Sequence, residues 1–261
     1  GSEMCIRDRI ENRAGVNNLQ SILDVSDGIM IGRGDMGVEI PYEELPDIQK
    51  TIINACRRAG KRCITATEML ESMISKPRPT RAEISDVANA VYDGSSAVML
   101  SGETAAGLYP VQAVAAMARI AIQAESKEQF IQKVADKDFL IRSTADALSH
   151  SACTLAKDVK AKAIVVCTRT GGTAKMVSRF RPMIDIIGMT TNARSYQKLA
   201  LSWGVMPVMS EEYNSVDVLF HFAKCAARDS GLVKKGDTIV ITGGTPNGKS
   251  GNSNLINIET I

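Results

Sequence analysis

Short apolar runs typical of strands alternate with amphipathic stretches typical of helices between residue 10 and about residue 125. The clearest strand-like runs are Gly28–Ile31, Cys63–Thr67 and Ala97–Leu100, the last of which is expected to be a buried strand, and a further strand is expected to end at Glu11. The pattern recurs every roughly 35 residues, which is typical of βα units whose parallel strands are joined through helices. Four such units are half of an eight-stranded barrel and too few to close one.

Local signals mark where the helices of this block begin and end. Apolar residues at helical spacing between Leu45 and Cys56 predict a helix that Gly60 stops. Thr80 and Glu83 form the pattern of a capping box, in which the threonine hydroxyl accepts from the Glu83 amide and the carboxylate reaches back. A further helix is expected from about Pro110 to Glu125.

The charged stretch Glu125–Glu128 marks a domain boundary, so we expect one domain at 10–125 and a second at 126–261. The second domain is predicted to be an α/β unit with a mixed, mostly parallel sheet that ends in an edge strand at Leu255–Ile258. Its other expected elements are helices near 128–135, 144–158, 173–180, 194–201 and 215–229, and strands at Ala163–Cys167, Ile184–Gly188, Val205–Val208 and Thr238–Thr242.

The first nine residues do not share the pattern of the rest. Gly1-Ser2 resembles a cloning scar, and Glu3–Arg9 is neither alternating nor continuously apolar. We therefore expect 1–9 to be a non-native leader, although Ile6–Arg9 stands where a strand belongs.

Composition excludes several classes of function. The formal net charge of +2 and the scattered basic residues do not indicate a nucleic-acid partner. No apolar run approaches the ~18–20 residues that span a membrane, and no signal peptide is visible. Six cysteines without CxxC spacing are best explained as buried free thiols, so a cytoplasmic location is expected.

Two acidic residues follow strand-like runs in neighbouring units. Glu11 lies in Ile10–Asn12, and Asp35 follows the apolar run and a Gly-rich turn at Gly32–Asp35. The carboxyl ends of parallel strands form the mouth where ligands bind in α/β folds. Two carboxylates there can share one hard divalent cation, Mg²⁺ or Mn²⁺, with phosphate oxygens and water. The alternative is two solvated acids at strand ends.

Five short motifs in this order carry a family resemblance, and together they resemble pyruvate kinase: Ile10–Asn12, Gly32–Gly37, Ile64–Met73, Pro77–Glu83 and Met99–Ala105. The resemblance covers residues 10–261. It implies the C-terminal half (strands five to eight) of a (β/α)8 TIM-type barrel, followed by the family's separate C-terminal regulatory α/β domain. The N-terminal half of the barrel and the lid domain have no counterpart in this chain.

The resemblance implies roles for individual residues. Glu11 and Asp35 would ligate the catalytic Mg²⁺ or Mn²⁺, and the amides of Gly34 and Asp35 would hold the carboxylate of phosphoenolpyruvate. Thr67 would contact that carboxylate and help to relay a proton, and Ser101 would be a second hydroxyl near the proton path. Read singly, Gly34 and Ser101 are equally typical of turns, and a threonine at a strand end is typical of β-propensity.

The chain also departs from the family pattern. Arg9 stands where the family has the lysine that contacts the transferring phosphoryl group, and arginine keeps the charge without the compact geometry. Glu68 stands where glutamine is common in the family. Arg33 and Arg81 resemble framework or subunit-interface residues. The family's K⁺ ligands and its substrate-binding arginine belong to the half that this chain lacks.

A hydroxyl- and glycine-rich loop in the second domain follows a strand and opens a helix, so it offers amide donors to a phosphate. By resemblance it is the allosteric sugar-phosphate site, formed by Thr168, Arg169, Thr170, Gly171, Gly172 and Thr173. The second effector loop, Gly243–Gly251, lacks the Trp and Arg of the animal enzymes, which leaves a phosphorylated effector other than fructose 1,6-bisphosphate open. An ordinary helix cap is the alternative.

These observations predict a bacterial-type pyruvate kinase fragment. The parent enzyme, expected to be a homotetramer, would transfer the phosphoryl group of phosphoenolpyruvate to ADP in glycolysis, giving pyruvate and ATP. The fragment alone is expected to be inactive, because half a barrel exposes two sheet edges and lacks the lid. The alternatives are a non-catalytic module that binds a phosphorylated metabolite and a truncated product with a compromised fold.

Overall fold

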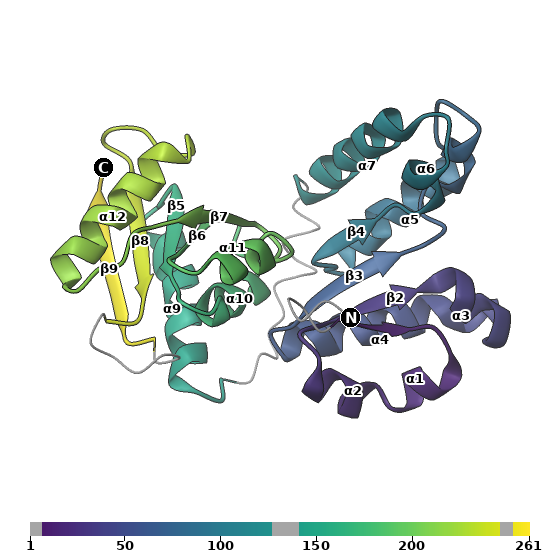
Figure 1. Cartoon of the computed structure of the whole chain (residues 1–261), viewed down its shortest axis with the longest axis horizontal. Coiled ribbons are helices and arrows are strands. Elements are labelled where there is room, and N and C mark those ends of the chain that lie inside the picture. The colour runs from purple at the N-terminus through teal and green to yellow at the C-terminus, as the bar shows by residue number, and fades with distance from the viewer. Residues whose placement is uncertain (1–6, 127–140, 246–252) are drawn as a thin grey trace. The chain divides into compact units, whose positions relative to one another are not determined.

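The computed structural model describes residues 7–126, 141–245 and 253–261 (Figure 1). The chain forms two compact units, residues 1–135 and 136–261. The division falls ten residues after the predicted boundary, in a stretch outside the described residues. The helix expected at 128–135 lies outside the described residues as well.

The first unit contains a four-stranded parallel sheet in the order β1-β2-β3-β4. The strands are β1 (Arg7–Ile10), β2 (Gly28–Gly32), β3 (Arg62–Ala66) and β4 (Ala97–Met99). The helices are α1 (Arg13–Asn17), α2 (Leu19–Val25), α3 (Arg33–Glu39), η1 (Tyr42–Glu44), α4 (Leu45–Arg58), η2 (Glu71–Ile74), α5 (Arg81–Tyr92), α6 (Gly102–Ala105) and α7 (Pro110–Glu125). The predicted half-barrel of βα units is therefore confirmed.

The local signals act as predicted. The Thr80 hydroxyl accepts from the Glu83 amide at 3.3 Å, and the Glu83 carboxylate accepts from the Thr80 amide at 2.7 Å. Gly60 follows α4 with a φ of 64°, a left-handed conformation that glycine adopts without strain. The β2 strand is buried along its whole length, as expected for a parallel strand, and its residues Ile29 and Ile31 pack in one cluster with residues of α2 and α4.

Three details of the first unit differ from the sequence prediction. The expected Gly-rich turn before Asp35 is the first turn of α3. The strand at β4 was expected to be buried, but all three of its residues are half-buried, because β4 lies at an edge of the sheet. The strand β1 begins at Arg7, inside the segment that sequence patterning set aside, because its backbone pairs in register with β2.

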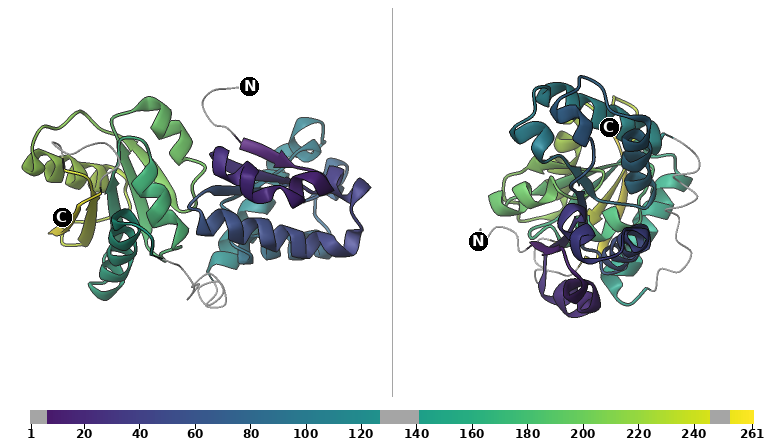
Figure 2. Two further views of the ribbon diagram at one scale, coloured as in Figure 1. Left: turned by 90° about the horizontal axis from the view of Figure 1, so that it is seen from below. Right: turned by 90° about the vertical axis from the view of Figure 1, so that its right-hand side faces the viewer.

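The second unit contains a five-stranded sheet in the order β7-β6-β5-β8-β9, which Figure 2 shows from two further directions. Its strands are β5 (Ala163–Cys167), β6 (Asp185–Thr190), β7 (Val205–Met209), β8 (Thr238–Gly243) and β9 (Leu255–Thr260). Its helices are α9 (Thr144–Asp158), α10 (Gly172–Arg179), α11 (Ala193–Leu199) and α12 (Val216–Asp229). Because β9 alone is antiparallel and lies at the edge, the predicted mixed, mostly parallel sheet is confirmed.

Alternation along β5 divides the core of this unit between the two faces of the sheet. Val165 and Cys167 pack in a cluster with residues of α12, whereas Ile164 and Val166 pack with residues of α9 and α10. Successive strand residues point to opposite faces, so a continuous apolar run is buried only when both faces are covered. The run at Ala163–Cys167 therefore requires helices on both sides.

The cysteines of the described residues carry no disulfide, but they are not uniformly buried. Cys56, Cys63 and Cys167 are buried as expected, whereas Cys153 and Cys225 are half-buried because their helices lie at the surface of the second unit. Burial raises the pKa of the Cys167 thiol to about 12. Within the part of the chain that the structure describes, no helix is both long and apolar enough to span a bilayer.

Candidate functional site

The carboxyl ends of β1, β2 and β3 lie side by side at one edge of the first unit. In the register of the sheet, Ile10 is opposite Ile31 and Gly32 is opposite Ala66. The residues that follow these strands therefore emerge next to one another. The sheet brings together most of the residues that the sequence singled out in this unit.

Glu11 and Asp35 both contact the guanidinium of Arg9. Its Nη2 atom forms an ion pair with Glu11 Oε1 and lies 3.5 Å from Asp35 Oδ2. A Cβ atom on Gly32 would lie 2.8 Å from Glu11 Cγ, so the glycine leaves the space that the Glu11 side chain occupies. Asp35 also lies in the first turn of α3, where the helix dipole favours a carboxylate.

This arrangement is compatible with a single hard cation in place of the Arg9 guanidinium. Two carboxylates that converge on one nitrogen atom offer the oxygen donors that Mg²⁺ and Mn²⁺ prefer. Across the described ranges there is no group of three or more His, Cys, Asp or Glu side chains that could form a complete protein cage.

Thr67 lies directly after β3 and faces Gly34. The Gly34 amide donates to Thr67 Oγ1 at 2.8 Å, and the Thr67 hydroxyl donates to the Ala66 carbonyl at 2.6 Å. A Cβ atom on Gly34 would lie 3.6 Å from Thr67 Oγ1, an ordinary contact. Packing against the described residues therefore does not require glycine at this position.

Thr67 and Glu68 both have positive φ angles, 65° and 51°. Left-handed backbone costs a residue other than glycine about 1–3 kcal/mol, and a β-branched threonine adopts it rarely. Neither the strand pattern nor the family resemblance predicted this backbone conformation at Thr67. Strain of this kind persists where neighbouring groups hold it, and it is concentrated at functional sites.

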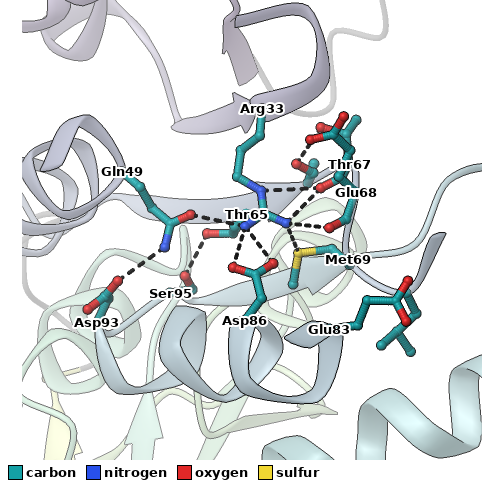
Figure 3. Close-up of polar contacts among 12 residues, drawn as sticks. Arg33, Gln49, Thr65, Thr67, Glu68, Met69, Glu83, Asp86, Asp93 and Ser95 are labelled. Atoms are coloured by element: carbon teal, nitrogen blue, oxygen red, sulfur yellow. Dashed lines mark hydrogen bonds and ion pairs between the residues drawn. The ribbon is translucent and has the colours of Figure 1, made fainter. Parts of the chain in front are cut away.

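The Arg33 guanidinium contacts this strained turn, as Figure 3 shows. Its Nε and Nη2 atoms donate to the Thr67 carbonyl at 3.2 and 2.8 Å, and Nη2 also donates to the Glu68 carbonyl at 3.0 Å. Its Nη1 atom lies 2.8 Å from Asp86. The sequence indicated a framework role for Arg33 but not its targets.

Ser101 lies at the N-cap position of α6, just beyond β4. Its amide donates to the Glu103 carboxylate at 2.7 Å, and the Leu70 amide donates to the other oxygen of Glu103 at 2.9 Å. Glu103 is fully buried, and its two backbone contacts join the loops after β3 and β4. The sequence analysis gave Ser101 a role and Glu103 none, because a single glutamate two residues after a serine carries no signal of burial.

Two glutamates near these loops have shifted pKa values. Burial raises the pKa of Glu71, and the nearby carboxylates of Glu103, Glu68 and Glu83 raise it further. Burial would also raise the pKa of Glu83, but the hydrogen bonds donated by Ser72 and Thr80 outweigh it and lower that pKa.

The loop Thr168–Thr173 of the second unit follows β5 and includes the first two residues of α10. The Thr168 hydroxyl is buried and accepts from the Gly171 amide at 3.0 Å, and Gly171 has a φ of 83°. Thr173 Oγ1 lies 2.7 Å from Ser253 Oγ, whereas Arg169 and Thr170 are exposed. Arg169 and Thr170 thus face solvent, whereas the buried Thr168 hydroxyl stabilises the conformation of the loop from inside. Most of the second effector loop lies outside the described residues.

Comparisons with known proteins agree on one family. Residues 1–114 match the family described as pyruvate kinase, barrel domain, and residues 146–259 match the family described as pyruvate kinase, alpha/beta domain. A pyruvate kinase of Clostridium acetobutylicum is 46% identical over 262 residues, covering 100% of this chain and 55% of the relative. A pyruvate kinase of Staphylococcus epidermidis is also 46% identical, over 100% of this chain and 45% of the relative.

A solved structure agrees with the sequence relatives. The crystal structure of a pyruvate kinase from Cryptosporidium parvum superimposes with a TM-score of 0.88 and 40% sequence identity, over 98% of this chain and 51% of the other. The chain thus spans about half the length of the curated relatives it matches.

Proposed function

Because this chain belongs to the pyruvate kinase family, we propose that it carries the metal-binding and carboxylate-binding part of a phosphotransferase active site. The observation that carries the proposal is the convergence of the Glu11 and Asp35 carboxylates on one cationic nitrogen, beside the contact between Gly34 and Thr67. The reaction proposed for the whole enzyme transfers the phosphoryl group of phosphoenolpyruvate to ADP, giving pyruvate and ATP.

Each residue has a role in this proposal. Glu11 and Asp35 would hold Mg²⁺ or Mn²⁺, which when bound neutralises negative charge on phosphoryl oxygens. The amides of Gly34 and Asp35 would donate to the carboxylate of phosphoenolpyruvate at the start of α3. The absence of a side chain at Gly34 lets that anion approach the peptide closely.

Thr67 would exchange partners when the substrate binds. In the structure its hydroxyl proton is directed to the Ala66 carbonyl, and its oxygen accepts from Gly34. A substrate carboxylate that takes the Gly34 amide would release one lone pair of Thr67 Oγ1. The hydroxyl could then turn toward the substrate and take part in proton relay together with Ser101, as we propose for both residues.

We propose that the chain alone does not phosphorylate ADP. By family resemblance, the K⁺ ligands, the substrate-binding arginine and the lid belong to a part of the enzyme that this sequence does not contain. By the same resemblance Arg9 stands where the family has its phosphoryl-contacting lysine, and it pairs with both carboxylates that we propose as metal ligands. Turnover near an ordinary enzyme rate that disappears in Asp35→Asn would refute this proposal.

Manganese binding tests the metal site directly. Loss of the electron paramagnetic resonance signal of free Mn²⁺ measures its binding to the purified chain. We expect one bound Mn²⁺, with the affinity lowered at least about tenfold in Asp35→Asn and in Glu11→Gln, equivalent to about 1.4 kcal/mol. Glu43→Gln removes an exposed carboxylate from the same unit and should leave the affinity within about twofold. Equal binding by all four proteins would refute the site.

A second activity, binding of a phosphorylated effector, is favoured by the geometry of the second unit. The exposed Arg169 and Thr170 stand beside the N-terminus of α10, and the left-handed Gly171 turns the backbone into that helix. This unit would then regulate a homotetrameric, cytoplasmic parent enzyme. Calorimetry against fructose 1,6-bisphosphate, glucose 6-phosphate, ribose 5-phosphate and AMP tests it, and no binding to any of them would leave the loop as a helix cap.

A further inference from the structure

We propose that Arg33, oriented by Asp86, is a positioning residue that holds the Thr67 hydroxyl against the Gly34 amide. The inference deepens the proposed function, because it rests on Gly34 and Thr67 forming the carboxylate pocket. Arg33 itself touches neither a metal ligand nor the proposed substrate position in the contacts described above. Its effect would pass entirely through the backbone of Thr67 and Glu68.

The first step is the orientation of the guanidinium. Arg33 Nη1 lies 2.8 Å from both carboxylate oxygens of Asp86, which comes from α5, and 3.4 Å from Gln49 Oε1 on α4. The Arg33 side chain is 12% exposed. Contacts from two helices thus fix the plane of the guanidinium, whose other edge faces the turn after β3 (Figure 3).

The second step is the contact with the strained turn. The opposite edge of the same guanidinium, formed by Nε and Nη2, donates to the carbonyls of Thr67 and Glu68. These two carbonyls belong to the two residues with positive φ. Holding both carbonyl oxygens fixes the peptide planes that follow each residue, so the turn cannot relax toward extended backbone without losing charge-assisted hydrogen bonds.

The third step joins the turn to the pocket. Arg33 and Gly34 are consecutive residues, and both contact Thr67: the arginine side chain contacts its carbonyl, and the Gly34 amide contacts its hydroxyl. Thr67 is therefore held at two points by adjacent residues of α3. If the carbonyl contact is lost, the Thr67 side chain should rotate with the backbone and release the Gly34 amide.

A planar guanidinium suits this role because three of its nitrogen atoms act at once in different directions. Lysine would keep the charge, but its single ammonium cannot reproduce the fork. Arg33→Lys is therefore the informative variant, because it separates geometry from charge. Arg81→Lys is the matched control, since Arg81 is an exposed arginine at the first position of α5 in the same unit.

Nuclear magnetic resonance of the whole chain tests the inference without reference to activity. We expect Arg33→Lys to increase hydrogen exchange of the Gly34 amide at least about tenfold and to shift the Thr67 methyl resonance, with exchange of the Ile64 amide in β3 unchanged. Asp86→Asn should give a smaller change in the same direction, and Arg81→Lys should change neither signal. If Arg33→Lys leaves both the Gly34 exchange and the Thr67 methyl as in wild type, the inference is wrong.

Ligand titrations then separate this inference from the proposed function. Mn²⁺ binding by the wild-type chain reports on the metal site, and oxalate binding to the Mn²⁺-loaded chain reports on the carboxylate pocket. We expect Arg33→Lys to weaken oxalate at least about tenfold with Mn²⁺ affinity within twofold. Failure of the wild type to bind Mn²⁺ would refute the proposed function. The resonance data would still decide whether Arg33 positions the Thr67 hydroxyl. An unchanged oxalate affinity in Arg33→Lys would overturn the positioning role.

Discussion

Replacing Arg9 should strengthen binding of a divalent cation at Glu11 and Asp35. In the structure the Arg9 guanidinium pairs with Glu11 and lies 3.5 Å from Asp35, so a metal ion that takes both carboxylates must displace it. Arg9→Gln removes the competing charge and keeps a polar side chain. The variant therefore isolates the electrostatic competition between the protein's own cation and the metal.

The size of the effect follows from the exposure of the three side chains. The Arg9 side chain is 51% exposed, that of Glu11 is 30% exposed and that of Asp35 is 65% exposed. Solvent therefore screens both ion pairs. Exposed ion pairs contribute about 0.2–1 kcal/mol each, and the two together about 0.4–2 kcal/mol. Since about 1.4 kcal/mol is tenfold, Mn²⁺ should bind about 2- to 30-fold more tightly to Arg9→Gln than to wild type.

Electron paramagnetic resonance titration with Mn²⁺ measures this difference. Arg58→Gln, which removes an exposed arginine at the end of α4, should bind Mn²⁺ within about twofold of wild type. The gain in Arg9→Gln should also shrink as salt is added, because salt screens exposed pairs. If Arg9→Gln binds Mn²⁺ no more tightly than wild type at low salt, Arg9 does not compete for the site.

Three further predictions concern the rest of the chain. Because the folded-state pKa of Glu83 is lowered, its contribution to stability is present above its unfolded pKa and is lost as pH falls through the folded pKa. Glu83→Gln should remove that contribution, about 1 kcal/mol or less because solvent screens the partly exposed carboxylate, and should flatten the acid limb of the unfolding curve measured by circular dichroism. Cys167, whose pKa is raised to about 12, should resist iodoacetamide at pH 8 in the native chain and react after unfolding in urea, and mass spectrometry showing native labelling would contradict this. Thr168→Val should lower the free energy of unfolding by about 1–3 kcal/mol, measured by thermal unfolding, because it leaves the Gly171 amide without its acceptor. Thr170→Ala should keep the stability and lower the affinity for any sugar phosphate measured by calorimetry. Equal melting temperatures for both variants would contradict a stabilising role of the Thr168 hydroxyl.

The regular elements could be predicted because their signals are local. The strand Ala163–Cys167 and the helix Thr144–Asp158 have the predicted boundaries, since apolar periodicity is complete within a few residues. The capping box of Thr80 and Glu83 spans one helical turn and is equally visible. The position of Glu11 and Asp35 after consecutive strands also followed from the sequence, because parallel strands end at one edge.

The tertiary structure alone decided how the site is held. Arg33 meets Thr67 across 34 residues, Glu103 meets Leu70 across 33, and Arg9 meets Asp35 across 26. No local pattern predicts such contacts, because each depends on the sheet register and on which loops the helices bring together. The left-handed backbone of Thr67 and Glu68 could not be predicted from local sequence either. This conformation is intrinsically unfavourable for both residues, and only contacts from distant residues can hold it.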